Sequence, residues 1–195
     1  MGDRLALVLA AFALVLLGGV AYTGLAAPER PAMEEYTLAI KAEATREGVR
    51  AEGATNLPDG ARLYVYVDRL YRLEDSDIWR AARIGEEVVE VRSGRWEAAV
   101  PTSDEAWVRA VAQRVDEKRY HPVRAVQDRV RVTALFAPLV PQPDEVREEM
   151  GPNFEGLSAS DQAIRQAEQW VLRALASVEK PLRRELEAQL LGTRR

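Results

Sequence analysis

The sequence of 195 residues contains no cysteine. Disulfides and cysteine-ligated metal sites are therefore excluded, and so is the lipidated cysteine of a lipoprotein. Histidine is almost absent too, because His121, which precedes Pro122, is the single one in the sequence. Neither a Cys–His catalytic pair nor a metal site with two histidine ligands can be built from this composition. We expect His121 to be an ordinary loop residue.

Several motifs of catalysis and phosphate binding are missing as well. The sequence has no G-x-S-x-G turn, no G-x-x-x-x-G-K loop and no G-x-G-x-x-G loop. Its 27 basic and 31 acidic residues give a net charge of −4 and are well mixed. A nucleic-acid-binding stripe or a polybasic lipid patch would need a block of positive charge. The sequence therefore predicts no enzymatic activity, no cofactor and no nucleic-acid partner.

A long apolar run is present at the start of the chain. Residues 5–27 are 23 positions without an acidic or basic side chain, and about 20 apolar residues in a helix cross a hydrocarbon core of about 30 Å. We predict a transmembrane anchor over residues 1–27, which contacts the lipid bilayer through residues 5–27. A cleaved signal peptide is the alternative, because Gly24 and Ala26 offer small residues for cleavage. The proximity of Pro28 and the length of the run favour the anchor.

The orientation of the anchor follows from its flanks. The amino terminus and Arg4 lie on one side, and Arg30 and Lys41 lie on the other, so the positive-inside rule gives a near tie. A very short tail before a large domain is typical of a signal-anchor. We expect a single-pass protein of a bacterial cytoplasmic membrane with its soluble domain outside the cytoplasm. Residues 28–35, with two prolines, form a stiff spacer.

Residues 36–141 show the patterns of antiparallel strands. Apolar residues alternate with polar ones over 36–44 and 128–136, and the strongest strand, 61–71, carries bulky groups on both faces, as a central strand does. Turns are predicted at 56–60 and at Ser93-Gly94, where Val89 and Val91 would face Trp96 and Ala98. A helix near 103–118 would begin at Thr102, with Glu105 completing a capping box. The predicted fold is mainly β with helical additions, an immunoglobulin-like β-sandwich.

Residues 142–195 are predicted to be helical, with a long amphipathic helix at about 160–191. Pro181 would kink this helix. It would either cover the sheet or serve as an arm for a partner, and its broad apolar stripe favours packing on its own domain. We expect Val171, Leu175 and Val178 to be buried. The full stripe comprises Ile164, Ala167, Val171, Ala174, Leu175, Val178, Leu182, Leu186 and Leu190.

Short motifs give a resemblance to a class of bacterial proteins. They are Thr55-Asn56-Leu57-Pro58-Asp59-Gly60 before an alternating strand, then Phe136-Ala137-Pro138, Gln142-Pro143 and Gly151. In these features residues 36–157 resemble uncharacterised bacterial proteins with one N-terminal anchor and a small exported β-sandwich. The resemblance implies that architecture and no activity.

Two groups of residues are candidates for binding. Tyr64, Tyr66, Tyr71 and Trp79 could line a platform for a ligand, or they could pack beneath the C-terminal helix. Asp68, Glu74, Asp75 and Asp77 offer hard oxygen ligands of the kind calcium requires. The loop has no EF-hand spacing, and Arg72, Arg80 and Arg83 could pair with these carboxylates instead.

We therefore expect a membrane-anchored envelope protein of structural or adaptor type, which binds a partner protein at the membrane surface through its β-sandwich. The alternative is a ligand-binding domain for an envelope glycan or lipid. A tyrosine-lined pocket would favour the ligand, and an exposed apolar stripe would favour the partner.

Overall fold

The structure, a computed structural model, describes residues 35–117, 119 and 121–192, all within the unit formed by Glu34–Arg195. The predicted anchor at 5–27 and nearly all of the spacer at 28–35 lie outside the described residues. Within these ranges, no helix is both long enough and apolar enough to cross a membrane.

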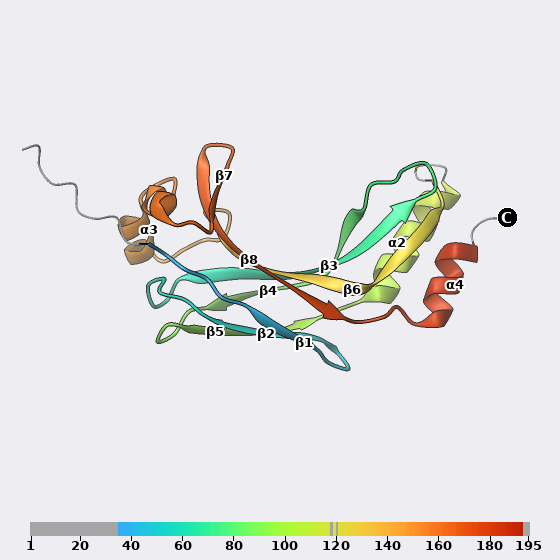
Figure 1. Ribbon diagram of the computed structural model, residues 1–195, viewed down its shortest axis with the longest axis horizontal. Helices are drawn as coiled ribbons and strands as arrows, with labels where there is room; N and C mark the ends of the chain where they lie inside the picture. The colour runs from blue at the N-terminus through green and yellow to red at the C-terminus, as the bar shows by residue number, and fades with distance from the viewer. Residues whose placement is uncertain (1–34, 118, 120, 193–195) are drawn as a thin grey trace, which may run out of the picture. The chain divides into compact units, whose positions relative to one another are not determined.

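Two antiparallel sheets form the fold, which confirms that the chain is mainly β (Figure 1). A three-stranded sheet has the order β1-β2-β5, and a five-stranded sheet has the order β4-β3-β6-β8-β7. The strands are β1 (Lys41–Ala44), β2 (Gly48–Ala54), β3 (Arg62–Leu73), β4 (Arg80–Glu90), β5 (Arg95–Pro101), β6 (Val123–Phe136), β7 (Ala163–Gln166) and β8 (Gln169–Glu179).

The strand predicted at 61–71 is central, as expected. It is β3, which pairs with β4 on one side and β6 on the other. Leu63, Val65 and Val67 are fully buried in the core that the two sheets share. Tyr64 and Tyr66 point to the opposite face of the five-stranded sheet, here called the outer face.

The hairpin turn at Ser93-Gly94 is confirmed, but its two arms separate. Ser93 and Gly94 both have positive φ, 51° and 70°, which is the geometry of a type I′ turn. Beyond the bridge between Arg92 and Arg95, β4 joins the five-stranded sheet and β5 joins the three-stranded sheet. The predicted partners therefore meet inside the core shared by the two sheets and not along a ladder.

The helix predicted near 103–118 is α2 (Asp104–Asp116), but its N-cap is Ser103 and not Thr102. The Thr102 backbone N–H donates to Glu47 O at 3.2 Å, which ties Thr102 to the loop before β2. Ser103 Oγ then accepts from the Ala106 N–H at 3.3 Å. The N-cap therefore lies one residue later than predicted, because Thr102 still belongs to the connection that follows β5.

The long helix predicted at 160–191 is wrong. The chain there forms the β7–β8 hairpin, in which Ala167 has φ 56°, and then a nine-residue helix, α4 (Arg184–Gly192). Leu172, Ala174 and Val178 face the core with a period of two, and β8 supplies the second neighbour of β6. Backbone pairing with β6 outweighs the helical spacing of the same apolar residues. Two other short helices precede the hairpin, α3 (Asp144–Met150) and the 3-10 turn η1 (Glu155–Ala159).

The burial predicted from that helix is corrected with it. Val171 and Val178 are buried, but Leu175 is 52% exposed on the outer face. The helix α4 contacts α2 and β6, and its Leu190 is 1% exposed. It is therefore neither a cover over the tyrosines nor a free arm.

Candidate functional site

The four aromatic residues predicted to form a platform lie in three places. Tyr64 and Tyr66 are neighbours on the outer face, with ring centroids 5.3 Å apart. Tyr71 is buried on the core side, where its ring packs 5.6 Å from that of Trp107. Trp79 lies in the β3–β4 loop, with the Arg72 guanidinium 4.3 Å above its ring. Only Tyr64 and Tyr66 can therefore contribute to one site.

These two tyrosines belong to a group of polar side chains that we call the tyrosine–arginine cluster. The ladder of β3 and β4 places Tyr66 opposite Glu86, and a bulge after Val67 places Asp68 opposite Arg83. The ladder of β3 and β6 places Asp68 opposite Arg131. The cluster consists of Tyr64, Tyr66, Asp68, Arg83, Glu86 and Arg131.

Arg83 is the centre of the cluster. Its guanidinium carbon lies 3.7 Å from the Tyr66 ring centroid and 5.2 Å from that of Tyr64, within the range of a cation–π interaction. Arg83 Nη1 donates to Tyr64 Oη at 2.8 Å. The Tyr64 hydroxyl in turn donates to the Glu86 carboxylate. Arg83 is thus held in one orientation by two rings and a hydroxyl.

Asp68 lies beneath two arginines and pairs with both, which leaves a net charge of +1 on the three side chains. Its carboxylate accepts from Arg131 Nη2 at 3.0 Å and lies 3.5 Å from Arg83 Nε. The Asp68 side chain is only 6% exposed, whereas those of Arg83 and Arg131 are 40% and 41% exposed. The carboxylate is therefore buried, and the surface of the cluster presents guanidinium groups and aromatic rings.

The contacts within the cluster shift two of its pKa values. Partial burial, followed by the hydrogen bond to Glu86, raises the pKa of Tyr64. Burial acts to lower the pKa of Arg83, but the negative charges of an ionised Tyr64 and of Asp68 outweigh it, and the net pKa is raised. Near neutral pH the phenol stays protonated and the guanidinium stays charged.

Two buried polar atoms beside the cluster have no hydrogen-bond partner within the described residues. They are Thr133 Oγ1 and Arg131 Nε. Thr133 is 1% exposed and lies directly opposite Tyr66 in the ladder. Buried donors without partners are uncommon, and here they lie under the same surface as the exposed arginines.

The four predicted calcium ligands are not brought together. Asp68 lies on the sheet between two arginines, while Asp75 lies 3.5 Å from His121 Nε2 and Asp77 pairs with Arg72 and Arg124. Glu74 follows β3 in the same loop. Across residues 35–117, 119 and 121–192, no group of three or more His, Asp or Glu side chains could hold a metal ion. Arginine pairing accounts for the carboxylates of Asp68 and Asp77.

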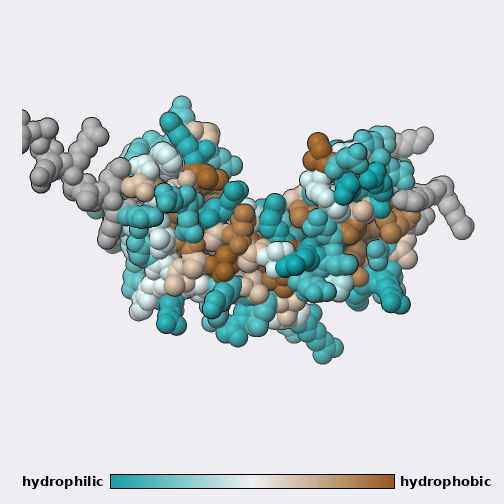
Figure 2. All heavy atoms as spheres, in the orientation of Figure 1, coloured by the Kyte–Doolittle hydropathy of each residue, from teal (hydrophilic) through white to brown (hydrophobic). Residues whose placement is uncertain are grey.

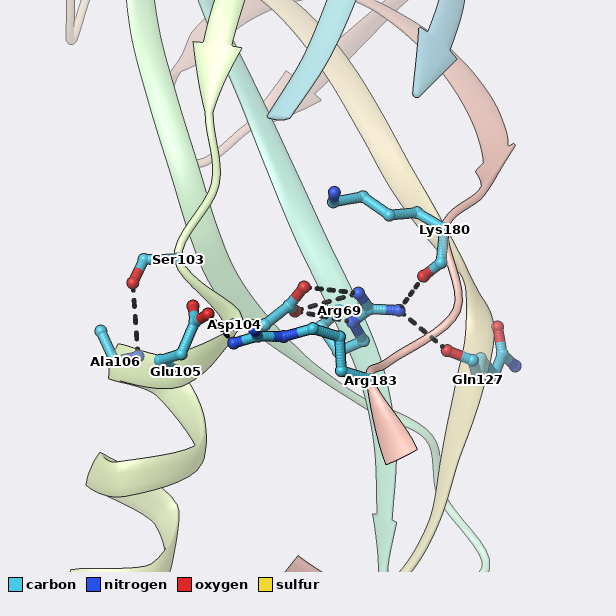
Figure 3. Close-up of polar contacts among 8 residues, drawn as sticks. All are labelled: Arg69, Ser103, Asp104, Glu105, Ala106, Gln127, Lys180 and Arg183. Carbon is cyan, nitrogen blue, oxygen red and sulfur yellow. Dashed lines mark hydrogen bonds and ion pairs between the residues drawn. The ribbon is translucent and has the colours of Figure 1, made fainter. Parts of the chain in front are cut away.

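Sequence reasoning missed a buried arginine that directly follows Asp68 on β3 and faces the other side of the sheet (Figure 3). Arg69 is 0% exposed and makes a bidentate pair with Asp104, the first residue of α2. Arg69 Nη1 also donates to Gln127 O at 3.2 Å and to Lys180 O at 2.5 Å, and Arg183 pairs with Glu105 nearby. With Nε–Asp104 as well, all three guanidinium nitrogens donate hydrogen bonds. Arg69 is therefore a structural tie between β3, α2, β6 and the end of β8.

Large apolar side chains are also exposed at the surface. Figure 2 shows hydrophobic residues in separate patches among hydrophilic ones on the face it displays. The most exposed is Ile78, at 73%, beside Trp79 in the β3–β4 loop. Among the described residues, the large exposed apolar side chains are Ile78, Trp79, Val88, Leu139, Ile164 and Leu175. Of these, Val88 is the neighbour of Tyr64 across the β3–β4 ladder.

Comparison of the chain with protein-family models, with curated proteins and with solved structures found no match. The resemblance to exported bacterial β-sandwich proteins therefore stays a prediction.

Proposed function

We propose that the chain is a non-catalytic binding protein of adaptor type, anchored in a bacterial cytoplasmic membrane. Its two-sheet domain, an exported immunoglobulin-like β-sandwich in this proposal, holds a partner protein at the membrane surface. The tyrosine–arginine cluster carries this proposal, because it is exposed, fixed in orientation and composed of the residue types that dominate binding energy at protein interfaces.

The chemistry of the cluster indicates what the partner offers. The exposed charges of Arg83 and Arg131 occur on a chain whose net charge is −4. The carboxylate between them is buried, and the exposed Glu86 already accepts from Tyr64. A partner surface with carboxylates and an apolar side chain would pair with the arginines and pack on Val88, which lies opposite Tyr64.

An envelope glycan or lipid is the weaker candidate. A sugar ring stacks on an open aromatic face, but Arg83 already lies 3.7 Å over Tyr66. The two tyrosine rings are also inclined at 43° to each other, so they do not form one flat platform. These contacts favour a protein partner.

Site-specific photo-crosslinking followed by affinity measurement tests the proposal. A photo-reactive phenylalanine replaces Val88, which is 51% exposed beside the cluster, in the full chain in its own membranes. The control carries the same group at Arg109, an exposed residue of α2. A protein captured at position 88 and not at 109 is then purified for binding measurements with unlabelled chains.

The affinity of the captured protein for variants of the chain then tests whether the tyrosine–arginine cluster is the binding surface. R83Q and Y66A should each weaken binding by about 30-fold or more, the scale of an interface hot spot. R50Q removes an arginine of an exposed pair with Glu97 on the other sheet and should leave the affinity unchanged. Equal affinities for all variants, or capture at both positions, would refute the cluster as the binding surface.

A further inference from the structure

The free edge of β8 is unusual among the sheet edges of this fold. The strand β8 pairs with β6 over Leu172–Glu179, but β7 covers its other side only over Gln169–Leu172. Beyond the ladder with β6, no backbone–backbone hydrogen bond to any described residue involves 173–179, and the Ser177 carbonyl accepts from the Arg129 side chain at 3.1 Å. Seven consecutive residues therefore have no strand paired on their second side.

The other edges are short or have a backbone group capped. The strands β1 and β7 have four residues each. On β4, Ile84 O accepts from Ser103 N at 2.9 Å, and on β5 the Ala99 N–H donates to Glu87 Oε2 at 2.8 Å. Short edges and capped backbone groups are the usual means by which proteins prevent edge-to-edge pairing.

Two of the usual protective devices are missing from residues 173–179, and the charged residues of the segment are Arg173 and Glu179 at its two ends. The segment contains no proline, its register with β6 is free of bulges, and its core-facing side chains are Ala174, Ala176 and Val178. A groove of about 460 Å³ runs beside the start of this edge, lined in part by Ile40, Ile164 and Leu175. There is thus regular backbone, space and apolar surface for an added strand.

The side chains of this edge complement themselves. An antiparallel pairing of two copies centred on Ala176 places Arg173 opposite Glu179 twice, and Leu175 opposite Ser177 twice. Both Arg173 and Glu179 are exposed, and neither makes an ion pair within the described residues. Arg129, which faces Glu179 in the ladder, instead donates to Ser177 Oγ at 3.2 Å. Opposite charges directly across an antiparallel pair stabilise it.

We propose that two copies of this chain pair antiparallel through the 173–179 edges of β8. A twofold axis at Ala176 makes the contact isologous, joins the two five-stranded sheets into one, and covers Leu175. This inference is independent of the tyrosine–arginine cluster, which lies on β3, β4 and β6.

Register-specific disulfide formation tests the proposal in the full, detergent-solubilised chain, which has no other cysteine. One tagged chain carries L175C and a second carries S177C. Because these positions face each other in the paired edges, the mixture should form a disulfide-linked heterodimer under mild oxidation. Each variant alone, and a mixture of E52C with S177C, should form about tenfold less. Equal yields in all mixtures would overturn the proposal.

Charge reversal supplies the second readout, measured by sedimentation equilibrium on cysteine-free chains. R173E and E179R should each weaken association by about tenfold, because each change introduces two like-charge pairs across the axis. The double variant R173E/E179R should regain the native association, since the pairs are restored with their signs exchanged. Tryptophan fluorescence checks that each variant is folded. A native chain that stays monomeric at all concentrations, or a double variant as weak as the single ones, would contradict the paired edge.

Discussion

At the scale of the residue, the interior position of Arg69 makes it more sensitive than any arginine on the surface. R69M removes the partner of Asp104 and leaves the carbonyls of Gln127 and Lys180 without a donor. Removal of one member of a buried pair costs about 3–5 kcal/mol. We expect the free energy of unfolding to fall by that amount in denaturant titrations followed by tryptophan fluorescence.

The control for this substitution is R50M. Arg50 and Glu97 form a close pair at 2.8 Å, but both side chains are about half exposed. Such pairs contribute about 0–1 kcal/mol. If R69M and R50M lower the free energy of unfolding by similar amounts, Arg69 does not hold β3, α2, β6 and the end of β8 together.

Gly53 gives a second prediction at this scale. A Cβ at this position would lie 1.9 Å from Ala39 O and 2.7 Å from Trp96 Nε1. Because a backbone oxygen cannot move away as a flexible side chain does, we expect G53A to lower the thermal midpoint of the full chain by several degrees.

Gly156 is the matched control, since a Cβ there would meet its nearest atoms at 3.4 Å. G156A should change the midpoint little. If G53A is as stable as G156A, the close approach of Ala39 to β2 is wrong.

Sequence reasoning reached part of this residue-scale picture. The alternation of residues along the strand at 61–71 is enough to predict that Tyr64 and Tyr66 share one face of a central strand. The pairing of Asp68 with arginines was an open alternative to calcium, but Arg131 lies 63 positions away, and only the β3–β6 register brings it to Asp68. The burial of Arg69 was predictable from the sequence, because Arg69 continues the alternating series of inward-facing residues Leu63, Val65 and Val67.

At the scale of the element, the β7–β8 hairpin shows where periodicity is ambiguous. Val171, Ala174, Leu175 and Val178 have helical spacing, and Leu172, Ala174, Ala176 and Val178 have strand spacing in the same residues. The strand is favoured over the helix because β6, which pairs with β3 on one side, needs a second backbone partner on its other side. That requirement is non-local and is not visible in the segment itself.

The contrast between Val171 and Leu175 tests this element. On the predicted helix both side chains would be buried, but in β8 Val171 is 3% exposed and Leu175 is 52% exposed. V171D places a charge against Leu135 and Ala137 and should destabilise the fold by several kcal/mol. L175D should change the free energy of unfolding by less than about 0.5 kcal/mol, as surface substitutions do.

Denaturant titration of monomeric full chain measures both variants. Keeping the protein dilute separates folding from the association of β8 edges, in which Leu175 takes part. Equal destabilisation by V171D and L175D would contradict the strand.

At the scale of the whole molecule, composition and alternation predicted a mainly β fold, and two antiparallel sheets are found. The division of strands between the sheets was not predictable, because the β4–β5 turn looks like an ordinary hairpin although its arms enter different sheets. The anchor rests on hydropathy alone, since residues 5–27 lie outside the described part of the chain. It therefore requires a direct test.

The last prediction concerns the placement of the chain in the membrane. If residues 5–27 remain as a helix across the bilayer, the full chain should stay in the membrane fraction after a carbonate wash, because burial of about 20 apolar residues resists extraction. A soluble product beginning near Ala27 would instead show cleavage. An alkaline-phosphatase fusion after Arg195 should be active if the domain is exported as proposed, because this enzyme folds only outside the cytoplasm. The matched control replaces Leu14 and Val15 with arginine, which should release the chain from the membrane and silence the fusion, since each arginine at mid-span costs about 2.5–3.5 kcal/mol. An inactive fusion on a carbonate-resistant native chain would reverse the orientation and place the tyrosine–arginine cluster in the cytoplasm.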